Sequence, residues 1–373
     1  MMPQPAVATS TVAGRAVGSS SVRIWSLTSR ERLQRQLRRA GATAEEGTAE
    51  RVVLLRADWV FDEPIVKGLV KHAGHCVMQA QDGQCVAAVV APDRVEETAA
   101  LLEQGSAPAD LPRLPAAELA GSFNHQLRKR EPPFLLPLTE DAVRAIEARV
   151  FTGSYKGVTD FVTRYIWPRP AQAVTRVCAA AGITPNMVTS TGLVFVFVAL
   201  WAFWHGHYGW GLAAAWFMTF LDTVDGKLAR VTLNSSKFGD LYDHLIDLIH
   251  PPFWWWAWAV GLPAAGFMLA PDSIALQVII WGYILQRIEE GIFEVVYKMP
   301  MHMWRRFDSL FRLITARRNP NLAILTVATL AGRPDVGFNV VAVWVALCLV
   351  VHTVQILQAF VASRRGPLQS WLS

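Results

Sequence analysis

The most constraining feature of this sequence is a series of long apolar segments that fills its second half. A helix of about 20 apolar residues can cross a bilayer. Hydrophobic residues make up 52% of the 373-residue chain and charged residues only 17%, which is more apolar than an ordinary soluble protein. Residues 183–365 are therefore predicted to form an α-helical integral membrane domain. Its six predicted transmembrane helices are Met187–Trp204, Trp210–Ala229, Phe238–Leu262, Ser273–Tyr297, Asn321–Ala331 and Phe338–Ala362.

The basic residues between these segments predict an orientation. Lysine and arginine accumulate in the short loops on the cytosolic side. The connection between the second and third segments contains Lys227, Arg230 and Lys237, and the connection between the fourth and fifth contains six further basic residues. The opposite side has only Arg333. This asymmetry predicts a multi-pass protein of the inner or plasma membrane with its N- and C-termini in the cytosol.

The residues before the first apolar segment have a different character. Residues 1–20 lack the apolar core of a signal peptide and are predicted to be a disordered lead-in. Residues 21–140 have mixed charge and predict a small cytosolic α/β domain, followed by a juxtamembrane segment at 141–182. Within this segment, residues 160–181 alternate apolar residues with arginines, which predicts an amphipathic helix on the membrane surface. A solvated linker helix is the alternative.

Charge and cysteine usage narrow the possible partners. The net charge of +5 is modest and no basic soluble face is evident, so no nucleic-acid partner is expected. The four cysteines are scattered without metal-ligand spacing and are expected to be reduced thiols. The aromatic run Trp254–Trp256 with Trp258 is interpreted as an interfacial belt.

A cluster of aspartates interrupts the second and third apolar segments. Asp222 and Asp225 are three residues apart, and Asp243 and Asp247 are four apart, so each pair lies on one face of its helix. Two helices joined by a short connection can direct all four carboxylates at one spot, where they would repel one another without countercharge. Oxygen-only ligands suit Mg²⁺ or Mn²⁺ and not Zn²⁺. We therefore predict that these four aspartates hold Mg²⁺ or Mn²⁺, with two ions expected.

Buried salt bridges are the alternative explanation of these aspartates. Lys227, Arg230 and Lys237 are the basic residues that could form them. Three basic side chains near a helical hairpin do not account for four acids at helical spacing together with Gly226 and Gly239. The metal site is therefore the preferred interpretation.

This segment resembles the CDP-alcohol phosphatidyltransferase family. It matches the signature D-x2-D-G-x2-A-R-x8-G-x3-D-x3-D at every fixed position, and the resemblance extends over roughly residues 140–365. It implies a homodimeric membrane enzyme of phospholipid biosynthesis. Such an enzyme transfers a phospho-alcohol or phosphatidyl group from a CDP-activated donor to a hydroxyl acceptor and releases CMP. The fixed positions are Asp222, Asp225, Gly226, Ala229, Arg230, Gly239, Asp243 and Asp247.

The resemblance also implies a role for each of these residues. Asp222, Asp225 and Asp243 would bind metal and organise the CDP diphosphate. Asp247 would be a metal ligand and the general base that deprotonates the acceptor hydroxyl. The nucleotide pocket would be formed by Gly226, Ala229, Arg230 and Gly239.

The start of the first apolar segment also carries a familiar pattern. Thr184 and Pro185 are typical of a helix start, as N-cap and first helical residue. Similar enzymes have a T-P-N-x-x-T segment here, which implies that Asn186 and Thr189 lie near the nucleotide. Residues 155–160 resemble the segment before the surface helix in archaeal enzymes that transfer inositol phosphate from CDP-inositol, and a polar hinge is the alternative.

Basic residues after the fourth apolar segment predict a phosphate site. Arginine suits bidentate phosphate binding, and Arg317, Arg318 and Asn319 are the preferred residues for a pocket beside the metal. Plain positive-inside charge is the alternative. His244 and His250 flank Asp247 by about one turn each, where either could hydrogen-bond a carboxylate or simply pack.

The N-terminal domain resembles the second half of a sugar-nucleotidyltransferase, a domain fused to the membrane enzyme in archaeal inositol-lipid relatives. A buried strand at Val52–Leu55 precedes Asp58 and Asp62, which are metal candidates, and a hairpin is expected around Asp82-Gly83. The Gly-rich loop that grips nucleotide in active enzymes is absent from residues 1–55. The domain is therefore predicted to be truncated and inactive.

The sequence leaves the substrates open. The donor is either CDP-diacylglycerol, with a small polar alcohol or its phosphate as acceptor, or a CDP-polyol such as CDP-inositol, with a lipid or polyol phosphate as acceptor. The fused domain favours the second pair. Two other functions stay open: a non-catalytic membrane scaffold or transporter with an ion site, and nucleotidyl transfer by the soluble domain.

Overall fold

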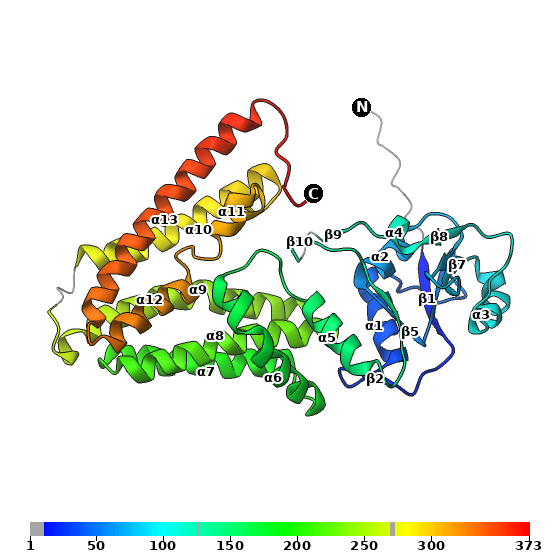
Figure 1. The fold of residues 1–373 in the computed structure, drawn as a ribbon, viewed down its shortest axis with the longest axis horizontal. Coiled ribbons are helices and arrows are strands. Elements are labelled where there is room, and N and C mark those ends of the chain that lie inside the picture. Colours follow the sequence, from blue (N-terminus) through cyan, green and yellow to red (C-terminus); the bar gives the residue numbers. More distant parts are fainter. Residues whose placement is uncertain (1–10, 125–126, 269–272) are drawn as a thin grey trace. The chain divides into compact units, whose positions relative to one another are not determined.

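The computed structural model describes residues 11–124, 127–268 and 273–373 (Figure 1). It divides into two compact units. The first contains the described residues up to 124 together with 130–154 and 231–233. The second contains 127–129, 155–230 and the described residues from 234 onward. The chain is thus mostly helical, with an α/β region at its N-terminal end.

The first unit is built on a five-stranded sheet of order β1-β4-β7-β6-β8. β1 is parallel to β4 and β6 to β8, while β7 is antiparallel to β4 and β6. Helices α1 and α2 pack on one face, and α3 packs on the other. The bounds of these elements are β1 Val12–Val17, β4 Arg51–Arg56, β6 Cys76–Gln79, β7 Cys85–Val90, β8 Arg113–Pro115, α1 Ser29–Ala40, α2 Glu63–Lys71 and α3 Val95–Glu103.

Short elements complete this part of the chain. β2 pairs with β3, and β5 pairs with β11, both antiparallel. Their bounds, with those of the remaining short elements, are β2 Arg23–Ile24, β3 Leu27–Thr28, β5 Trp59–Phe61, β9 Phe123–Asn124, β10 Lys129–Arg130, β11 Leu135–Pro137, α4 Ala116–Leu119 and α5 Val143–Gly153.

The sequence predicted the middle of this unit better than its beginning. The hairpin of β6 and β7 around Asp82-Gly83 and the buried strand β4 are confirmed. The prediction of a disordered lead-in over residues 1–20 is wrong for Val12–Val17, which form β1 with partly buried and buried side chains. Gly14 and Arg15 interrupt the apolar pattern of this strand and hide it. Residues 1–10 lie outside the described part of the chain.

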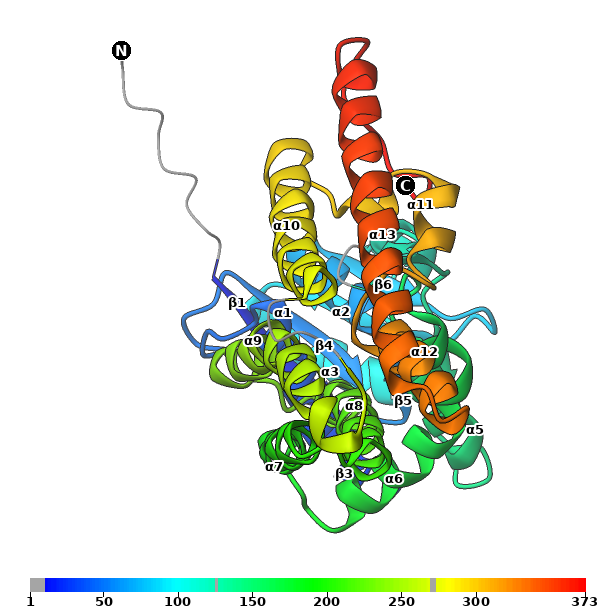
Figure 2. The same cartoon turned by 90° about the vertical axis from the view of Figure 1, so that its left-hand side faces the viewer.

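The second unit is a bundle of helices (Figures 1 and 2). α7 packs along α9, and α13 packs along α10 and α12. A π-helical turn at Val162–Ile166 precedes α6, so the predicted surface helix at 160–181 is two elements. The helices are α6 Pro168–Ala180, α7 Pro185–Trp204, α8 Tyr208–Val231, α9 Lys237–Gly261, α10 Ile274–Tyr297, α11 Arg306–Phe311, α12 Arg318–Leu330 and α13 Pro334–Ser363.

A helix is present at each of the six predicted transmembrane segments. Among the described helices, α7 and α13 are long and apolar enough to cross a membrane by length and composition. α8, α9 and α10 interrupt their apolar sequence with charges. α12 has 13 residues, about 20 Å at 1.5 Å per residue, which is shorter than the hydrocarbon core. A six-span topology stays a prediction.

Tryptophans of α9 lie in the core of the second unit. Trp254, Trp255 and Trp258 are at most 1% exposed, and the Trp254 indole N–H donates to the Val196 carbonyl at 2.9 Å. The interpretation of this run as an interfacial belt is therefore wrong for these three residues. Trp256, at 40% exposed, faces outward. The buried rings fix α9 against α7 and so help to place the aspartates about two to four turns earlier in the helix.

Candidate active site

Three of the four predicted aspartates lie close together in the structure. They come from α8 and α9, two helices that follow each other in the chain. Ser236 caps α9 by accepting a hydrogen bond from the Gly239 N–H at 3.0 Å, which starts the helix about two turns before Asp243. Asp222 and Asp225 lie on one face of α8. Ligand oxygens of Asp222, Asp225 and Asp243 lie within 4.8 Å of one another. The helical spacing therefore gathers carboxylates from two helices.

The fourth aspartate is held differently. The Asp247 carboxylate accepts a hydrogen bond from Nη1 of Arg318, and Nη2 of the same guanidinium donates to Asp222 at 2.6 Å. Arg318 begins α12 and is mostly buried. It thus bridges the two carboxylates and supplies countercharge. The sequence prediction placed Arg318 on a substrate phosphate; in the structure its guanidinium is bound to the aspartates.

The surroundings of the Asp225 carboxylate indicate whether these residues could hold a cation. Its side chain is 4% exposed, and Oδ2 accepts a hydrogen bond from the Thr189 hydroxyl at 2.6 Å. Oδ1 is buried and has no hydrogen-bond partner among the described residues. A buried carboxylate oxygen without a partner is unfavourable, and an all-carboxylate donor set suits a hard divalent cation. Asp222, Asp225 and Asp243 therefore fit such an ion.

A small pocket is lined by two of these carboxylates, Asp225 and Asp243, together with residues from the starts of α7 and α9. Arg230 lies next to it, with its guanidinium 3.7 Å from the position of a Cβ on Gly226. The Thr184 N-cap at the start of α7 is confirmed, because its side chain accepts a hydrogen bond from the Met187 N–H. The pocket brings together most of the residues that the sequence assigned to the donor: Asn186, Thr189, Asp225, Gly226, Ala229, Gly239 and Asp243.

Substitution of each of the two glycines in this pocket by alanine is expected to have a different effect. A Cβ on Gly239 would lie 2.6 Å from the Asn186 Oδ1, so Gly239→Ala must displace Asn186. A Cβ on Gly226 would meet only the flexible Arg230 guanidinium at ordinary contact distance. We expect Gly226→Ala to leave the thermal unfolding midpoint near wild type, because the added methyl group meets no close atom of the protein. The same methyl group occupies space in the pocket, so CDP binding should weaken about tenfold, as when a bound molecule loses about one hydrogen bond.

Isothermal titration with CDP, together with thermal unfolding, checks these expectations. Gly239→Ala should lower both the affinity and the unfolding midpoint, because the clash is within the protein. If both variants bind CDP with unchanged affinity, the nucleotide does not bind in this pocket.

A second and larger cavity has the fourth aspartate in its wall. It has a volume of about 360 Å³, and Asp247, His244 and Tyr283 lie on its wall. The Asp247 side chain is 37% exposed. Six cationic side chains among the described residues line the cavity: Arg128, Lys156, Arg287, Arg312, Arg317 and Arg318.

A buried network fixes part of this basic wall. Arg287 donates to Glu290 at 2.9 Å, and Arg317 donates to the other Glu290 oxygen. Glu290, His302 and His352 also lie close enough to share a metal. The Glu290 oxygens already accept hydrogen bonds from arginines, so the group serves as a polar network. Sequence analysis missed the role of Glu290, although a carboxylate within an apolar helix is a signal for a buried partner.

The remaining predicted polar residues have structural partners. Asn319 donates to Asp160 at 3.0 Å and lines the basic cavity. The Nδ1 of His250 is 2.6 Å from the Ile246 carbonyl, and its ring packs on Trp254. Of the two alternatives for His250, hydrogen bonding to a carboxylate or simple packing, the structure therefore shows packing.

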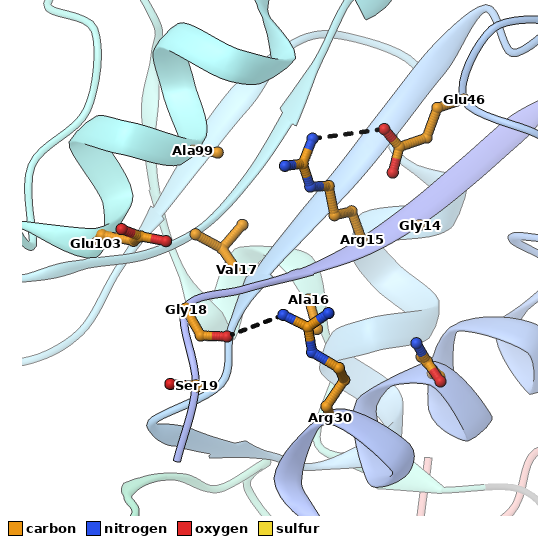
Figure 3. A pocket seen from close by; sticks show the side chains of 11 residues that line it. Gly14, Arg15, Ala16, Val17, Gly18, Ser19, Arg30, Glu46, Ala99 and Glu103 are labelled. Carbon is orange, nitrogen blue, oxygen red and sulfur yellow. Dashed lines mark hydrogen bonds and ion pairs between the residues drawn. The ribbon is translucent and has the colours of Figure 1, made fainter.

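The first unit has a cavity of its own, of about 530 Å³, along β1 (Figure 3). Arg15 and Arg30 lie at its walls, where Arg15 pairs with Glu46 and Arg30 donates to the Gly18 carbonyl. Glycine and arginine therefore gather beside β1 even though the sequence lacks a Gly-rich nucleotide loop.

The two metal candidates of the first unit have local structural roles. The Asp58 carboxylate accepts a hydrogen bond from Arg56 Nε at 3.0 Å. The Asp62 carboxylate accepts one from the Glu63 N–H at 2.9 Å and caps α2. These contacts account for both carboxylates without a metal.

Comparison with known proteins identifies the helical part. A sequence model of the CDP-alcohol phosphatidyltransferase family matches residues 182–313. The phosphatidylinositol phosphate synthase of Mycolicibacterium smegmatis is 28% identical over 34% of this chain and 60% of its own length. The protein of the same name from Mycobacteroides abscessus is 30% identical over 29% of the chain and 52% of its own length.

A protein from an archaeon is also similar in sequence to this chain, over a shorter stretch. The archaetidylinositol phosphate synthase of Pyrococcus horikoshii is 37% identical over 21% of this chain and 42% of its own length. The chain thus spans roughly half the length of these curated relatives. Residues 182–313 include both aspartate pairs and the surrounding glycines. This stretch of the chain is a CDP-alcohol phosphatidyltransferase domain.

Proposed function

We propose that this chain transfers a phosphatidyl-type group from a CDP-linked lipid to a hydroxyl of a phosphorylated polyol, with release of CMP. The observation that carries the proposal is that aspartates of the same signature line two pockets of different chemistry. Asp225 and Asp243 line the pocket with the two signature glycines, and Asp247 lines the basic cavity. Donor and acceptor therefore have separate pockets, each lined by aspartates of the signature.

The basic cavity supports a phosphorylated acceptor. A phosphomonoester carries up to two negative charges near neutral pH, and arginines bind it through paired, charge-assisted hydrogen bonds. Arg317 and Arg287 are oriented by Glu290 at the cavity wall. The names of the relatives, which include phosphatidylinositol phosphate synthase, support an inositol phosphate as the acceptor and a lipid as the donor.

The residues predict a direct displacement at phosphorus. With the acceptor phosphate in the basic cavity, a free acceptor hydroxyl lies near Asp247, which accepts its proton. The oxygen forms a bond to the β-phosphorus of the donor, and the bond from that phosphorus to the CMP oxygen breaks. Asp222, Asp225 and Asp243 would hold a divalent cation, which would neutralise diphosphate charge as CMP leaves. Arg318 keeps Asp222 and Asp247 apart and oriented.

A substrate matrix tests the proposal. Purified protein in detergent with Mn²⁺ is given CDP-diacylglycerol or CDP-inositol, each with inositol or inositol phosphate, and CMP release is followed. We expect release with CDP-diacylglycerol and inositol phosphate, and much less with unphosphorylated inositol. If CMP is released from CDP-inositol and not from CDP-diacylglycerol, the donor is a CDP-polyol. If no donor and acceptor pair releases CMP, the proposed activity is contradicted.

Lys156 gives this acceptor site a pH dependence. Its side chain reaches solvent through the cavity, but the surrounding protein removes much of its hydration, and Arg230 and Arg128 repel its charge, so its pKa is lowered to about 8. Lys156 is therefore charged below about pH 8 and loses its charge above it. We expect the acceptor KM to rise as the pH increases from 7 to 9.

Two variants isolate this contribution. Lys156→Arg should flatten the dependence, because arginine stays charged. Lys156→Ala should raise the acceptor KM about tenfold at pH 7, the order of one charge-assisted hydrogen bond. A pH profile of KM that is identical in Lys156→Ala and wild type would remove Lys156 from acceptor binding.

A further inference from the structure

Helix α9 contains two adjacent prolines just after the proposed base. In an α-helix the N–H of each residue donates to the carbonyl four residues earlier. Pro251 and Pro252 lie inside α9 and have no N–H to donate. The carbonyls of Asp247 and Leu248 therefore lose their partners within the helix, and one of them belongs to the residue that would take the acceptor proton.

A tyrosine from the neighbouring helix occupies the place of the missing donors. The Tyr283 hydroxyl of α10 donates to the Leu248 carbonyl at 3.0 Å and lies 3.5 Å from the Asp247 carbonyl oxygen. The Tyr283 ring is covered by the Arg287 guanidinium, 5.5 Å from its centroid. Because Arg287 is itself bound to Glu290, the phenol has a fixed position against the turn that carries Asp247.

We propose that Tyr283 is a positioning residue for Asp247. Its hydroxyl holds the 247–248 backbone where the prolines have freed it, and this keeps the Asp247 carboxylate at the wall of the basic cavity. The inference rests on the proposed function for its effect on turnover. A displacement of about 1 Å in a reacting group can cost about 100-fold in rate, so a single hydroxyl can have a large effect.

Tyr283→Phe removes only the hydroxyl. We expect kcat for CMP release to fall 10- to 100-fold, with the donor KM within about twofold of wild type. Tyr208→Phe is the matched control, because the Tyr208 hydroxyl donates to the Trp258 carbonyl of the same helix at 2.9 Å, away from the aspartates. Both variants lose one hydrogen bond to α9, and only Tyr283→Phe should change kcat.

Restoring the missing backbone donor separates positioning from substrate contact, since Tyr283 also lines the cavity. Pro252→Ala returns an N–H that can bond the Leu248 carbonyl within the helix. If Tyr283 acts through the backbone, Tyr283→Phe in the Pro252→Ala background should recover most of the lost kcat. A double variant as slow as Tyr283→Phe, or a Tyr283→Phe enzyme with wild-type kcat, would overturn the inference.

Hydrogen exchange provides a readout that does not need turnover. The amides of residues 247–250 and 253–256 should exchange faster in Tyr283→Phe than in wild type or Tyr208→Phe, and Pro252→Ala should reverse the change. If wild-type protein releases no CMP but shows this pattern, the proposed function fails while the backbone role of Tyr283 stands. Unchanged exchange in Tyr283→Phe contradicts that role whatever the activity.

Discussion

Asp247→Asn is expected to lower the rate of CMP release by about 10²- to 10⁴-fold, the usual contribution of a general base. Asparagine keeps the size of the side chain and can still accept a hydrogen bond from Arg318, the partner of Asp247 in the structure. It cannot take the proton of the acceptor hydroxyl. The loss should therefore appear in kcat, with CDP affinity close to that of wild type.

The measurement is a steady-state assay of CMP release, with titration of CDP to follow donor binding. Asp335→Asn is a suitable control, because Asp335 forms a local ion pair with Arg333 at the start of α13. Exposed pairs of this kind contribute little to stability, so this variant should keep wild-type rates. An Asp247→Asn enzyme with more than about a tenth of wild-type kcat would exclude Asp247 as the base.

Asp225→Asn is expected to abolish turnover and to stabilise the metal-free protein. Asp225 is buried with one oxygen that lacks a hydrogen-bond partner among the described residues, and it lies within 4.8 Å of two other carboxylates. Removing its charge relieves repulsion, and Thr189 can still donate to the amide oxygen. A gain of about 1 kcal/mol would raise the metal-free unfolding midpoint by about 2–4 °C.

The same substitution removes a ligand from the proposed cation site. A bound metal supplies several kcal/mol of transition-state stabilisation, so the rate should fall by about 10³-fold or more. Thermal unfolding with and without Mn²⁺ measures both effects. Wild type should be stabilised by the ion, and Asp225→Asn should not. Equal stabilisation of the two proteins by Mn²⁺ would place the ion elsewhere.

The positions of the aspartates were predictable because they depend on local geometry. Spacings of three and four residues fix which side chains share a helical face, and a short connection brings α8 next to α9 in the chain. That Gly226, Gly239 and Asn186 line one pocket was predictable for the same reason, since both glycines are on those faces and Asn186 follows the capped start of α7.

The partners of Arg317 and Arg318 were not predictable from the sequence. Arg317 is the N-cap residue of α12 and Arg318 is its first residue, and their carboxylate partners lie 27 to 96 positions earlier in the chain. Helical periodicity specifies which face a residue occupies but not which distant helix packs against that face. Tyr283 was missed for the same reason, because its partner carbonyls lie on α9 and become available only where Pro251 and Pro252 interrupt the helical hydrogen bonds.

The beginning of the first unit was missed because its strand is short and irregular in composition. β1 contains Gly14 and Arg15, which weaken its apolar pattern. Its side chains are buried because α1 and α3 cover the sheet beside it. Burial of this strand is thus a property of its neighbours and not of its own sequence.

The most direct test of the central claim is the dependence of CMP release on a divalent cation at the α8–α9 carboxylates. Wild-type protein is depleted of metal with EDTA, assayed with CDP-diacylglycerol and inositol phosphate, and assayed again after addition of Mg²⁺ or Mn²⁺. We predict loss of CMP release on depletion and recovery on addition, with no recovery in Asp225→Asn. Undiminished CMP release from the metal-depleted wild-type protein would contradict the account.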